Sequence, residues 1–410
     1  MLGNYLYILK KECNMMKINK MIFAITILSL NLATDAKKIW YAPNQFEAYG
    51  EEEIKAVENC LRSGWLAGFG PKTVQFESEI AARFGKKYAL FVNSGSSANL
   101  LALAALQIGP GDEVITPACT FATTVAPIIQ LGATPVFCDV AFNKYVPEVE
   151  EVIKLITPKT KCIMIPNLAG NKPDWQALRN LTDLPLIEDS CDTITYTPES
   201  DIATASFYAS HVMTACGSGG MVMFNDEKLY KIATMYRDWG RIGNNLEDMN
   251  ERFNYQIDGI SYDFKFLYGV LGYNFKSSEV NAAFGLEQLK KLDGFLAKRR
   301  ALIERYITNL QGTSFILPDD SIKPNWLAMP LMSKNRLNLL HYLEQNGVQT
   351  RVTFAGNITR HPAYRNYLQV FPNADRVMAE GFMLGAHHGM NIDDVDYVCN
   401  LLIEWDKNNN

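Results

Sequence analysis

From residue 87 onward, short apolar segments rich in β-branched residues alternate with longer segments whose apolar side chains recur at helical spacing. The apolar segments predict five strands, at 87–93, 112–117, 134–140, 161–166 and 185–189. The segments between them predict four helices, at 96–107, 121–131, 147–156 and 173–181. Strands and helices that alternate in this way form a mostly parallel sheet covered by helices, so the predicted fold class is α/β.

Two further strands are predicted at 204–210 and 221–225, on either side of the glycine-rich turn 216–220. A connection of this length joins antiparallel strands, so we expect a hairpin-like addition to the sheet.

The C-terminal part predicts a second, smaller domain. A long helix at 277–311 has leucines spaced among lysines and arginines, and it is followed by a helix at 335–345 and a strand at 348–352. We therefore divide the chain into a leader (1–38), a large domain with an N-terminal arm (39–299) and a small α/β domain (300–410).

The leader contains an apolar segment, 21–33, preceded by Lys17 and Lys20, and this resembles the apolar part of a signal peptide. It is shorter than the roughly 20 residues of an ordinary membrane span, and it contains Asn31. Only a second start at Met16 would place the charges at the N-terminus. A signal peptide and a poorly packed or disordered leader both stay open, and no stable membrane insertion is expected.

Composition narrows the class of protein. With 410 residues, 48% hydrophobic and 20% charged, the chain is a packed, enzyme-sized protein and not a disordered, collagen-like or coiled-coil one. A net charge of -5 supplies no basic field for nucleic acid. The eight cysteines include no CxxC pair, so they predict neither a metal site nor a disulfide framework, and they favour a reducing, cytoplasmic location.

The first candidate site is the segment 93–99 (NSGSSAN), which lies where a strand ends and a helix begins. Free backbone N–H groups at such a helix start, with the hydroxyls of Ser96 and Ser97 and the open backbone of Gly95, can hold a phosphate. The same pattern is also that of a serine that only caps a helix.

Two more segments carry candidate chemistry. The segment 186–192 (LIEDSCD) is an apolar strand that ends in acids at the edge where open α/β sheets bind ligands. Asp189 there can hold a proton on a heteroaromatic nitrogen and make the ring an electron sink, or it can be a solvated loop acid. The segment 206–211 (SFYASH) contributes Ser206 and His211, and a lone histidine is either structural or catalytic.

In this order and spacing, the three segments resemble the DegT/DnrJ/EryC1/StrS family of sugar aminotransferases. The resemblance extends from about residue 40 to the C-terminus, and further segments support it. These are 111–117 (GDEVITP) with Thr120 and Phe121, 272–276 (GYNFK), and 354–357 (FAGN).

This resemblance implies the PLP-dependent transferase fold of type I and a pyridoxal or pyridoxamine 5'-phosphate cofactor. Gly95, Ser96 and Ser206 would hold the cofactor phosphate, Asp189 would pair with the pyridine nitrogen, and Phe121 would lie over the ring. Asn274 would reach the phosphate from a neighbouring subunit, so at least a homodimer is expected.

One departure from the family is informative. Its aminotransferases have a lysine, which forms a Schiff base with the cofactor, where this chain has His211. Imidazole cannot form that bond, but with an ordinary pKa of about 6.5 it can act as a base near neutrality. The exchange resembles the 3-dehydratase branch, whose members act on CDP- or GDP-linked 4-keto-6-deoxyhexoses in deoxysugar biosynthesis, as for lipopolysaccharide O-antigen, with glutamate as amino donor in one group.

Other departures limit the resemblance. Trp239-Gly240-Arg241 is not followed by the cysteines that hold an iron–sulfur cluster in some members, so no cluster is expected. The family's Gly-Glu-Gly-Gly turn reads Gly217-Ser218-Gly219-Gly220, and Val212 stands where the dehydratases have a second histidine.

Two questions stay open. Asn167, Leu168, Gly170 and Asn171 form either a wall of the site or a simple loop. The alternative functions are an aminotransferase-like enzyme, with Lys276 as a candidate by residue type, and a non-catalytic protein that binds a nucleotide sugar.

Overall fold

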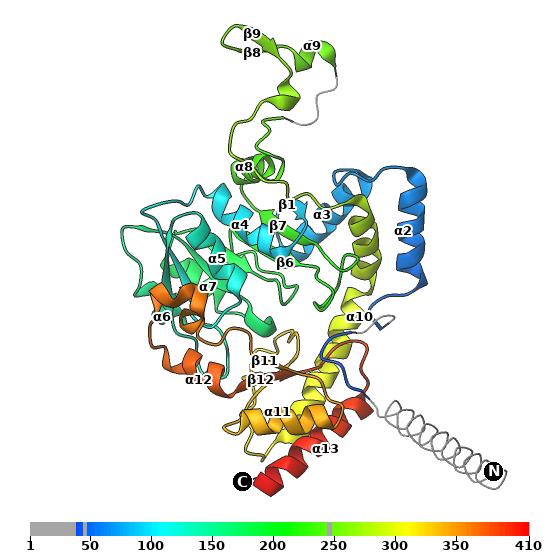
Figure 1. Ribbon diagram of the computed structural model, residues 1–410, viewed down its shortest axis with the longest axis vertical. Coiled ribbons are helices and arrows are strands. Elements are labelled where there is room, and N and C mark those ends of the chain that lie inside the picture. Colours follow the sequence, from blue (N-terminus) through cyan, green and yellow to red (C-terminus); the bar gives the residue numbers. More distant parts are fainter. Residues whose placement is uncertain (1–37, 44–46, 244–247, 410) are drawn as a thin grey trace, which may run out of the picture.

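The computed structural model describes residues 38–43, 47–243 and 248–409, and the predicted leader lies outside these ranges except for Lys38. At its centre is a seven-stranded sheet with the strand order β1-β7-β6-β5-β4-β2-β3 (Figure 1). The strands are β1 (Tyr88–Val92), β2 (Glu113–Pro117), β3 (Thr134–Cys138), β4 (Thr160–Pro166), β5 (Leu186–Asp189), β6 (Ile202–Ser206) and β7 (Gly220–Phe224). Only β7 runs antiparallel to its neighbours, β1 and β6, so the mostly parallel sheet and the hairpin-like addition are confirmed.

One predicted strand, 204–210, is wrong at its C-terminal end. β6 ends at Ser206, whose ladder partner is Gly220, and the chain then turns away from the sheet. The N–H of His211 donates to the carbonyl oxygen of Tyr208 at 3.0 Å, which closes this turn. As a result His211 lies beside the end of the sheet instead of within a strand.

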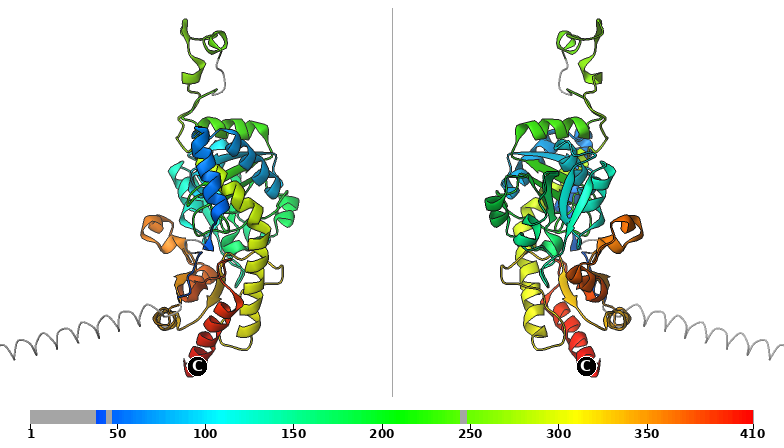
Figure 2. Two further views of the ribbon diagram at one scale, coloured as in Figure 1. Left: turned by 90° about the vertical axis from the view of Figure 1, so that its right-hand side faces the viewer. Right: turned by 90° about the vertical axis from the view of Figure 1, so that its left-hand side faces the viewer.

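Helices cover both faces of the sheet (Figure 2). One face packs on α4 (Gly95–Ala105), α5 (Ala122–Gln130) and α8 (Glu227–Arg237). The other face packs on α3 (Pro71–Phe84), α6 (Val149–Ile153), α7 (Trp175–Leu181) and the long α10 (Glu279–Leu310), while α2 (Glu51–Ser63) lies against α10. Because both faces are covered, the strands are apolar along their whole length, which is why they could be found from the sequence.

The small domain is built on a three-stranded antiparallel sheet in the order β10-β12-β11. Its elements are β10 (Met329–Met332), α11 (Arg336–Gln345), β11 (Thr350–Val352), the 3-10 helices η4 (Ile358–Arg360) and η5 (Pro362–Tyr367), α12 (Pro372–Glu380), β12 (Gly381–Leu384) and α13 (Ile392–Asn409). Helix α10 runs through the proposed boundary at residue 300 and packs on both α2 and α13, so it joins the two domains rigidly (Figure 1).

An arm between α8 and α10 projects away from the rest of the chain (Figure 1). It carries α9 (Met249–Arg252), the hairpin β8 (Tyr255–Ile257) and β9 (Ile260–Tyr262), and the 3-10 helix η3 (Phe264–Phe266). Several of its large apolar side chains are exposed, among them Ile260 and Tyr268. The sequence did not predict this arm.

No helix in the described ranges is long and apolar enough to cross a membrane.

Candidate active site

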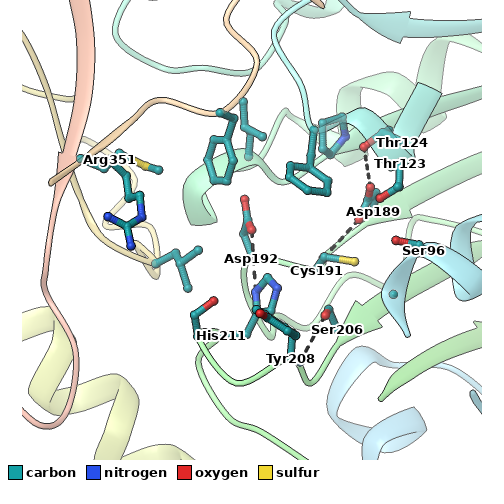
Figure 3. Close-up of a pocket in the computed structure, with 18 of the residues that line it drawn as sticks. Ser96, Thr123, Thr124, Asp189, Cys191, Asp192, Ser206, Tyr208, His211 and Arg351 are labelled. Atoms are coloured by element: carbon teal, nitrogen blue, oxygen red, sulfur yellow. Dashed lines mark hydrogen bonds and ion pairs between the residues drawn. The ribbon is translucent and has the colours of Figure 1, made fainter. Parts of the chain in front are cut away.

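A cavity of about 450 Å³ opens at the carboxyl ends of β4, β5 and β6, between the large sheet and the small domain. Sequence-distant segments meet there, and Figure 3 shows the side chains that face one another across it. Six of the eight predicted site residues line it: Gly95, Ser96, Phe121, Asp189, Ser206 and His211. The structure therefore brings the three candidate segments together around one cavity.

The start of α4 forms one end of the cavity. Ser94 caps this helix, because its hydroxyl accepts from the N–H of Ser97 at 3.1 Å. The N–H groups of Gly95 and Ser96, at the first two helical positions, have no partner within the helix and carry its positive dipole end. Together with the hydroxyls of Ser96 and Ser206, they form a cradle of neutral donors that suits a phosphate.

Gly95 is tightly surrounded at this end. A Cβ atom built on it would lie 2.6 Å from the Cys191 sulfur and 2.8 Å from the Ser206 Cβ atom, so only glycine fits. Ser97 does not line the cavity, since its hydroxyl donates to the Asn93 side-chain oxygen at 2.7 Å. The helix cap is thus made by Ser94, while the backbone N–H groups of Gly95 and Ser96 stay free to bind a ligand.

Asp189 is fixed at the end of β5 and is 4% exposed. Its Oδ2 accepts from Asn99 Nδ2 at 2.8 Å and from the Thr124 hydroxyl at 2.7 Å. Its Oδ1 has only a 3.3 Å contact with the Cys191 N–H, which leaves acceptor capacity toward the cavity. A carboxylate held in this way can accept a hydrogen bond from a protonated ring nitrogen.

The predicted ring cover, Phe121, is 53% exposed and lies at the N-cap position of α5. Its ring is 6.4 Å from the ring of Phe354, at an interplanar angle of 84°. An aromatic side chain that is exposed and lines a cavity leaves its face free to pack on a flat ligand.

His211 faces Asp192 in the middle of the cavity, between Ser206 and Arg351 (Figure 3). Its Nδ1 lies 3.9 Å from Asp192 Oδ1, which is longer than a hydrogen bond, and this nitrogen has no hydrogen-bond partner among the described residues. The other carboxylate oxygen of Asp192 accepts from the N–H of Ala169 at 2.8 Å. No hydrogen bond at Nδ1 therefore decides which ring nitrogen of His211 carries the proton.

The environment of this pair changes both pKa values. Burial, with a contribution from the Arg299 charge, lowers the pKa of His211 to about 4. Burial raises the pKa of Asp192 to about 7. The expectation that His211 titrates near its ordinary pKa is therefore wrong: the imidazole is neutral at pH 7, as a base must be, and makes no ion pair with Asp192.

No lysine lines the cavity among the residues that the structure describes. Lys276, the candidate by type, lies outside it and is 10% exposed, with its Nζ 3.2 Å from Asp238 Oδ2 and 4.7 Å from the Trp239 ring centroid. Asn274 also lies outside this chain's cavity, where its backbone pairs with that of Asp238. Its predicted role in the site of a neighbouring subunit stays a prediction.

Of the four candidate wall residues, only Leu168 lines the cavity. Asn167 is fully buried and donates to Glu188 and Ser190, both at 2.6 Å. Asn171 donates to the Lys144 carbonyl oxygen at 2.9 Å. These two asparagines are structural in this chain.

The sequence did not reveal the lining residues outside the motifs, above all Tyr41, Leu327, Arg351 and Met383. Arg351 is the one lysine or arginine among the lining residues in the described part of the chain. Figure 3 places it on the small-domain side of the cavity, away from Ser96. The sequence around Arg351 did not predict its place in the cavity, because that place depends on which strand of the C-terminal sheet faces the large domain.

The cavity lies at the carboxyl ends of the parallel strands, where open α/β sheets bind ligands, and comparison with known proteins identifies the family. The model of the DegT/DnrJ/EryC1/StrS aminotransferase family matches residues 47–403, so the chain belongs to this family.

Particular relatives include dehydratases. The chain is 36% identical to the lipopolysaccharide biosynthesis protein RfbH of Salmonella typhimurium (88% of this chain, 91% of the relative). It is 33% identical to the dTDP-4-dehydro-2,6-dideoxy-D-glucose 3-dehydratase of Saccharopolyspora spinosa (87% and 84%). The structure of the Escherichia coli GDP-4-keto-6-deoxy-D-mannose 3-dehydratase with bound hydrated PLP matches with a TM-score of 0.79 at 28% identity (89% and 100%). Aminotransferases also occur among the similar structures.

Proposed function

We propose that this chain is a PLP/PMP-dependent 3-dehydratase of nucleotide-linked 4-keto-6-deoxyhexoses, with His211 as the base. The observation that carries this proposal is that His211 faces a cavity that no lysine lines within the described ranges. Without a primary amine to bind the cofactor covalently, the site favours the free amine form, pyridoxamine 5'-phosphate. The relatives named as 3-dehydratases support the same reaction.

The residues at the α4 end fit this cofactor. The N–H groups of Gly95 and Ser96 and the Ser206 hydroxyl would bind its phosphate, and Asp189 Oδ1 would accept from its ring nitrogen. Phe121 would cover one face of the ring. When bound, the cofactor supplies an amine for the C4 ketone of the sugar and a ring that draws electrons toward its protonated nitrogen.

His211 then moves the proton that the reaction requires. With the cofactor bound, the neutral imidazole of His211 would accept a proton from the C4' carbon and could donate it to the C3 hydroxyl, which would leave as water. Asp192, beside Nδ1, stabilises the positive charge that His211 gains for that time. An amino donor such as glutamate restores the amine for the next turnover.

The small-domain side of the cavity suits an anionic part of a substrate. Arg351 lies on β11 with its guanidinium carbon 5.4 Å from the Tyr41 ring centroid, and its Nη1 donates to the Thr350 carbonyl oxygen at 2.7 Å. This leaves further N–H donors for the diphosphate of a nucleotide sugar or the carboxylate of an amino donor.

A homodimer would complete the phosphate end. The cradle around Gly95 offers neutral donors only, and Asn274, which the family resemblance assigns to the phosphate, is outside this chain's own cavity. The projecting arm supports a second copy as well, because its apolar residues Ile260 and Tyr268 are exposed in the part of the chain that the structure describes.

The test is a product assay. Purified protein with pyridoxamine phosphate and glutamate is incubated with CDP-, GDP- and dTDP-linked 4-keto-6-deoxyhexoses, and products are identified by mass spectrometry. We expect a product lighter than the substrate by one oxygen atom, and none from a His211→Asn variant that still binds the cofactor. A nitrogen-containing sugar would indicate an aminotransferase, and binding without turnover a non-catalytic protein.

A further inference from the structure

Arg299, on the buried side of α10, is a cation without a carboxylate partner. It is 3% exposed, and no Asp or Glu oxygen lies within 4 Å of it in the part of the chain that the structure describes. Its donors go to backbone carbonyls: Nη1 to Leu327 at 2.7 Å and to Ala386 at 3.3 Å, and Nη2 to His211 at 3.4 Å.

Other arginines of this chain show how unusual this is. Arg237, 5% exposed, lies between two carboxylates, with its Nε 2.8 Å from Asp238 and its Nη1 3.2 Å from Glu77. Arg300, next to Arg299 on α10, holds both oxygens of Asp320 at 2.7 Å. A buried cation with no carboxylate partner costs free energy, and the hydrogen bonds of Arg299 to three backbone carbonyls offset part of that cost.

Arg299 completes a closed set of contacts around His211. Asp192 accepts from the Ala169 N–H at 2.8 Å, the Ala169 carbonyl accepts from the Leu327 N–H at 2.7 Å, and the Leu327 carbonyl accepts from Arg299. Arg299 also donates to the backbone of His211, whose ring nitrogen faces Asp192. The backbone of His211 and the carboxylate that its ring faces are thus joined through one connected set of hydrogen bonds.

The backbone in this set of contacts is tightly constrained. Ala169 has a positive φ of 56°, and a Cβ atom on its neighbour Gly170 would collide with the Asn325 carbonyl oxygen. The contact with Ala386 connects this set of contacts to the loop that follows β12. A single guanidinium therefore links the turn that carries His211 to the small domain.

We propose that Arg299 is a positioning residue for His211: it fixes the turn that carries the base, ties this turn to the small domain, and places a positive charge behind the imidazole. The catalytic part of this role rests on the function proposed above. The positive charge of Arg299 disfavours protonation of the His211 imidazole, so His211 stays neutral until a substrate is bound.

Other groups also face this region. Asp192 lies beside His211, the Tyr208 ring is 6.3 Å from it, and Tyr41 and Arg351 line the same cavity. Beyond Arg299, the pKa values of His387 and His388 are lowered to about 4 and about 3, by burial and then by the same Arg299 charge. These two histidines therefore report on the charge independently of the active site.

Three variants separate charge from geometry. Arg299→Gln removes the charge, Arg299→Lys keeps it but loses the forked donors, and Arg300→Gln is a control on the same helix that breaks the ion pair with Asp320. Histidine ring resonances are followed by NMR against pH in the full chain, with the His211 signal identified by its loss in His211→Asn. The kcat and KM values are measured in parallel.

In Arg299→Gln we expect the titration midpoint of His211 to rise measurably, but to stay below the ordinary value because burial, the larger cause of the lowered pKa, remains. In Arg299→Lys and Arg300→Gln it should stay low. Turnover of Arg299→Lys should fall on the order of tenfold, with little change in KM, because the base is displaced while the binding groups remain.

An unchanged His211 midpoint in folded Arg299→Gln would overturn the electrostatic part, and wild-type turnover in Arg299→Lys would overturn the positioning part. If Arg299→Gln does not fold, the lysine variant still decides the second point. The titration needs no catalysis, so a shift without any dehydratase activity would count against the proposed reaction and not against the role of Arg299.

Discussion

The part of the cavity around Asp189, which we call the ring-nitrogen end, and the part around His211, which we call the base end, are built in opposite ways. At the ring-nitrogen end, both oxygens of Asp189 have protein partners, and those on Oδ2 are short, at 2.7 and 2.8 Å. At the base end, His211 Nδ1 has no hydrogen bond and its nearest carboxylate oxygen is 3.9 Å away. The Asp189 carboxylate is held by hydrogen bonds to its oxygens, whereas His211 is held through its backbone and its ring Nδ1 has no hydrogen-bond partner among the described residues.

This difference fits the roles proposed above for Asp189 and His211. A carboxylate that keeps a ring nitrogen protonated works best when it is preorganised and does not move during the reaction. A base has to change its charge, and a ring locked into strong hydrogen bonds in one protonation state would resist that change. The following experiments act on one end at a time, from the largest expected effect to the smallest.

Substitution at the base end should have the largest effect. Replacing His211 with Asn removes the proton acceptor, so dehydration should fall by about 1000-fold, within the range that general bases contribute. Replacing it with Lys should also abolish dehydration, and it should add a covalent bond to PLP that borohydride fixes at position 211. Turnover of the product lighter by one oxygen is measured for both variants, with peptide mapping for the lysine variant. A lysine variant that keeps full dehydration would show that His211 does not occupy the catalytic lysine position.

Substitution of Asp189, at the ring-nitrogen end, should lower turnover by a smaller factor. Asp189→Asn keeps the volume but weakens protonation of the ring nitrogen, so kcat should fall by about 100-fold while the affinity for pyridoxamine phosphate changes less. Thr124→Val is the matched control, because it removes one hydrogen bond to Asp189 and leaves the charge. Calorimetric binding and steady-state kinetics separate the two quantities. An Asp189→Asn enzyme with unchanged turnover would mean that this carboxylate does not pair with the ring.

Mixing variants tests whether the phosphate end is completed by a second copy. Asn274→Ala and His211→Asn chains are each expected to be inactive alone. If Asn274 acts across the interface, a mixed dimer regains one intact site, so an equal mixture should recover about a quarter of the wild-type activity. Activity is measured after subunit exchange has been demonstrated by native mass spectrometry. No recovery after exchange would place Asn274 outside the neighbouring site.

The smallest effect concerns stability near the base end. His388 stacks on Phe295 at 3.8 Å between ring centroids, and neither of its ring nitrogens has a partner among the described residues. Its pKa, about 3, lies below the unfolded value near 6.5, so the unfolded chain binds more protons and stability is lost as the pH falls from 6.5 toward 3. His388→Phe should raise the free energy of unfolding by about 1 kcal/mol at pH 7 and reduce its loss at pH 5.

Urea unfolding at the two pH values measures this change, with His341→Phe, at an exposed position of α11, as the control. A His388→Phe protein that loses as much stability between pH 7 and pH 5 as the wild type would show that His388 is not held neutral.

The ring-nitrogen end was largely predictable from the sequence. Buried parallel strands are apolar along their whole length, so the strand before Asp189 and the junction before Gly95 were found within a few residues. Both residues lie at strand ends that meet at the same edge of the sheet, which brings their motifs together without knowledge of the small domain.

The base end was predictable only in residue identity. The turn after Ser206 looked like the end of a strand, because its residues favour extended structure and only the pairing with Gly220 ends β6. The pKa of His211 depends on burial and on Arg299, 88 positions further along the chain. Contacts of such sequence separation, like those of Arg351 and Tyr41, follow from tertiary packing and leave no local pattern.

The most direct test of the central claim is whether the wild-type cavity binds its cofactor without a covalent bond. The protein is loaded with PLP, treated with borohydride, denatured and mapped by peptide mass spectrometry. We predict that the stoichiometric cofactor is released on denaturation and that no lysine is modified in proportion to occupancy. A single lysine peptide carrying the reduced cofactor at full occupancy, with Lys276 as the candidate by residue type, would contradict the account.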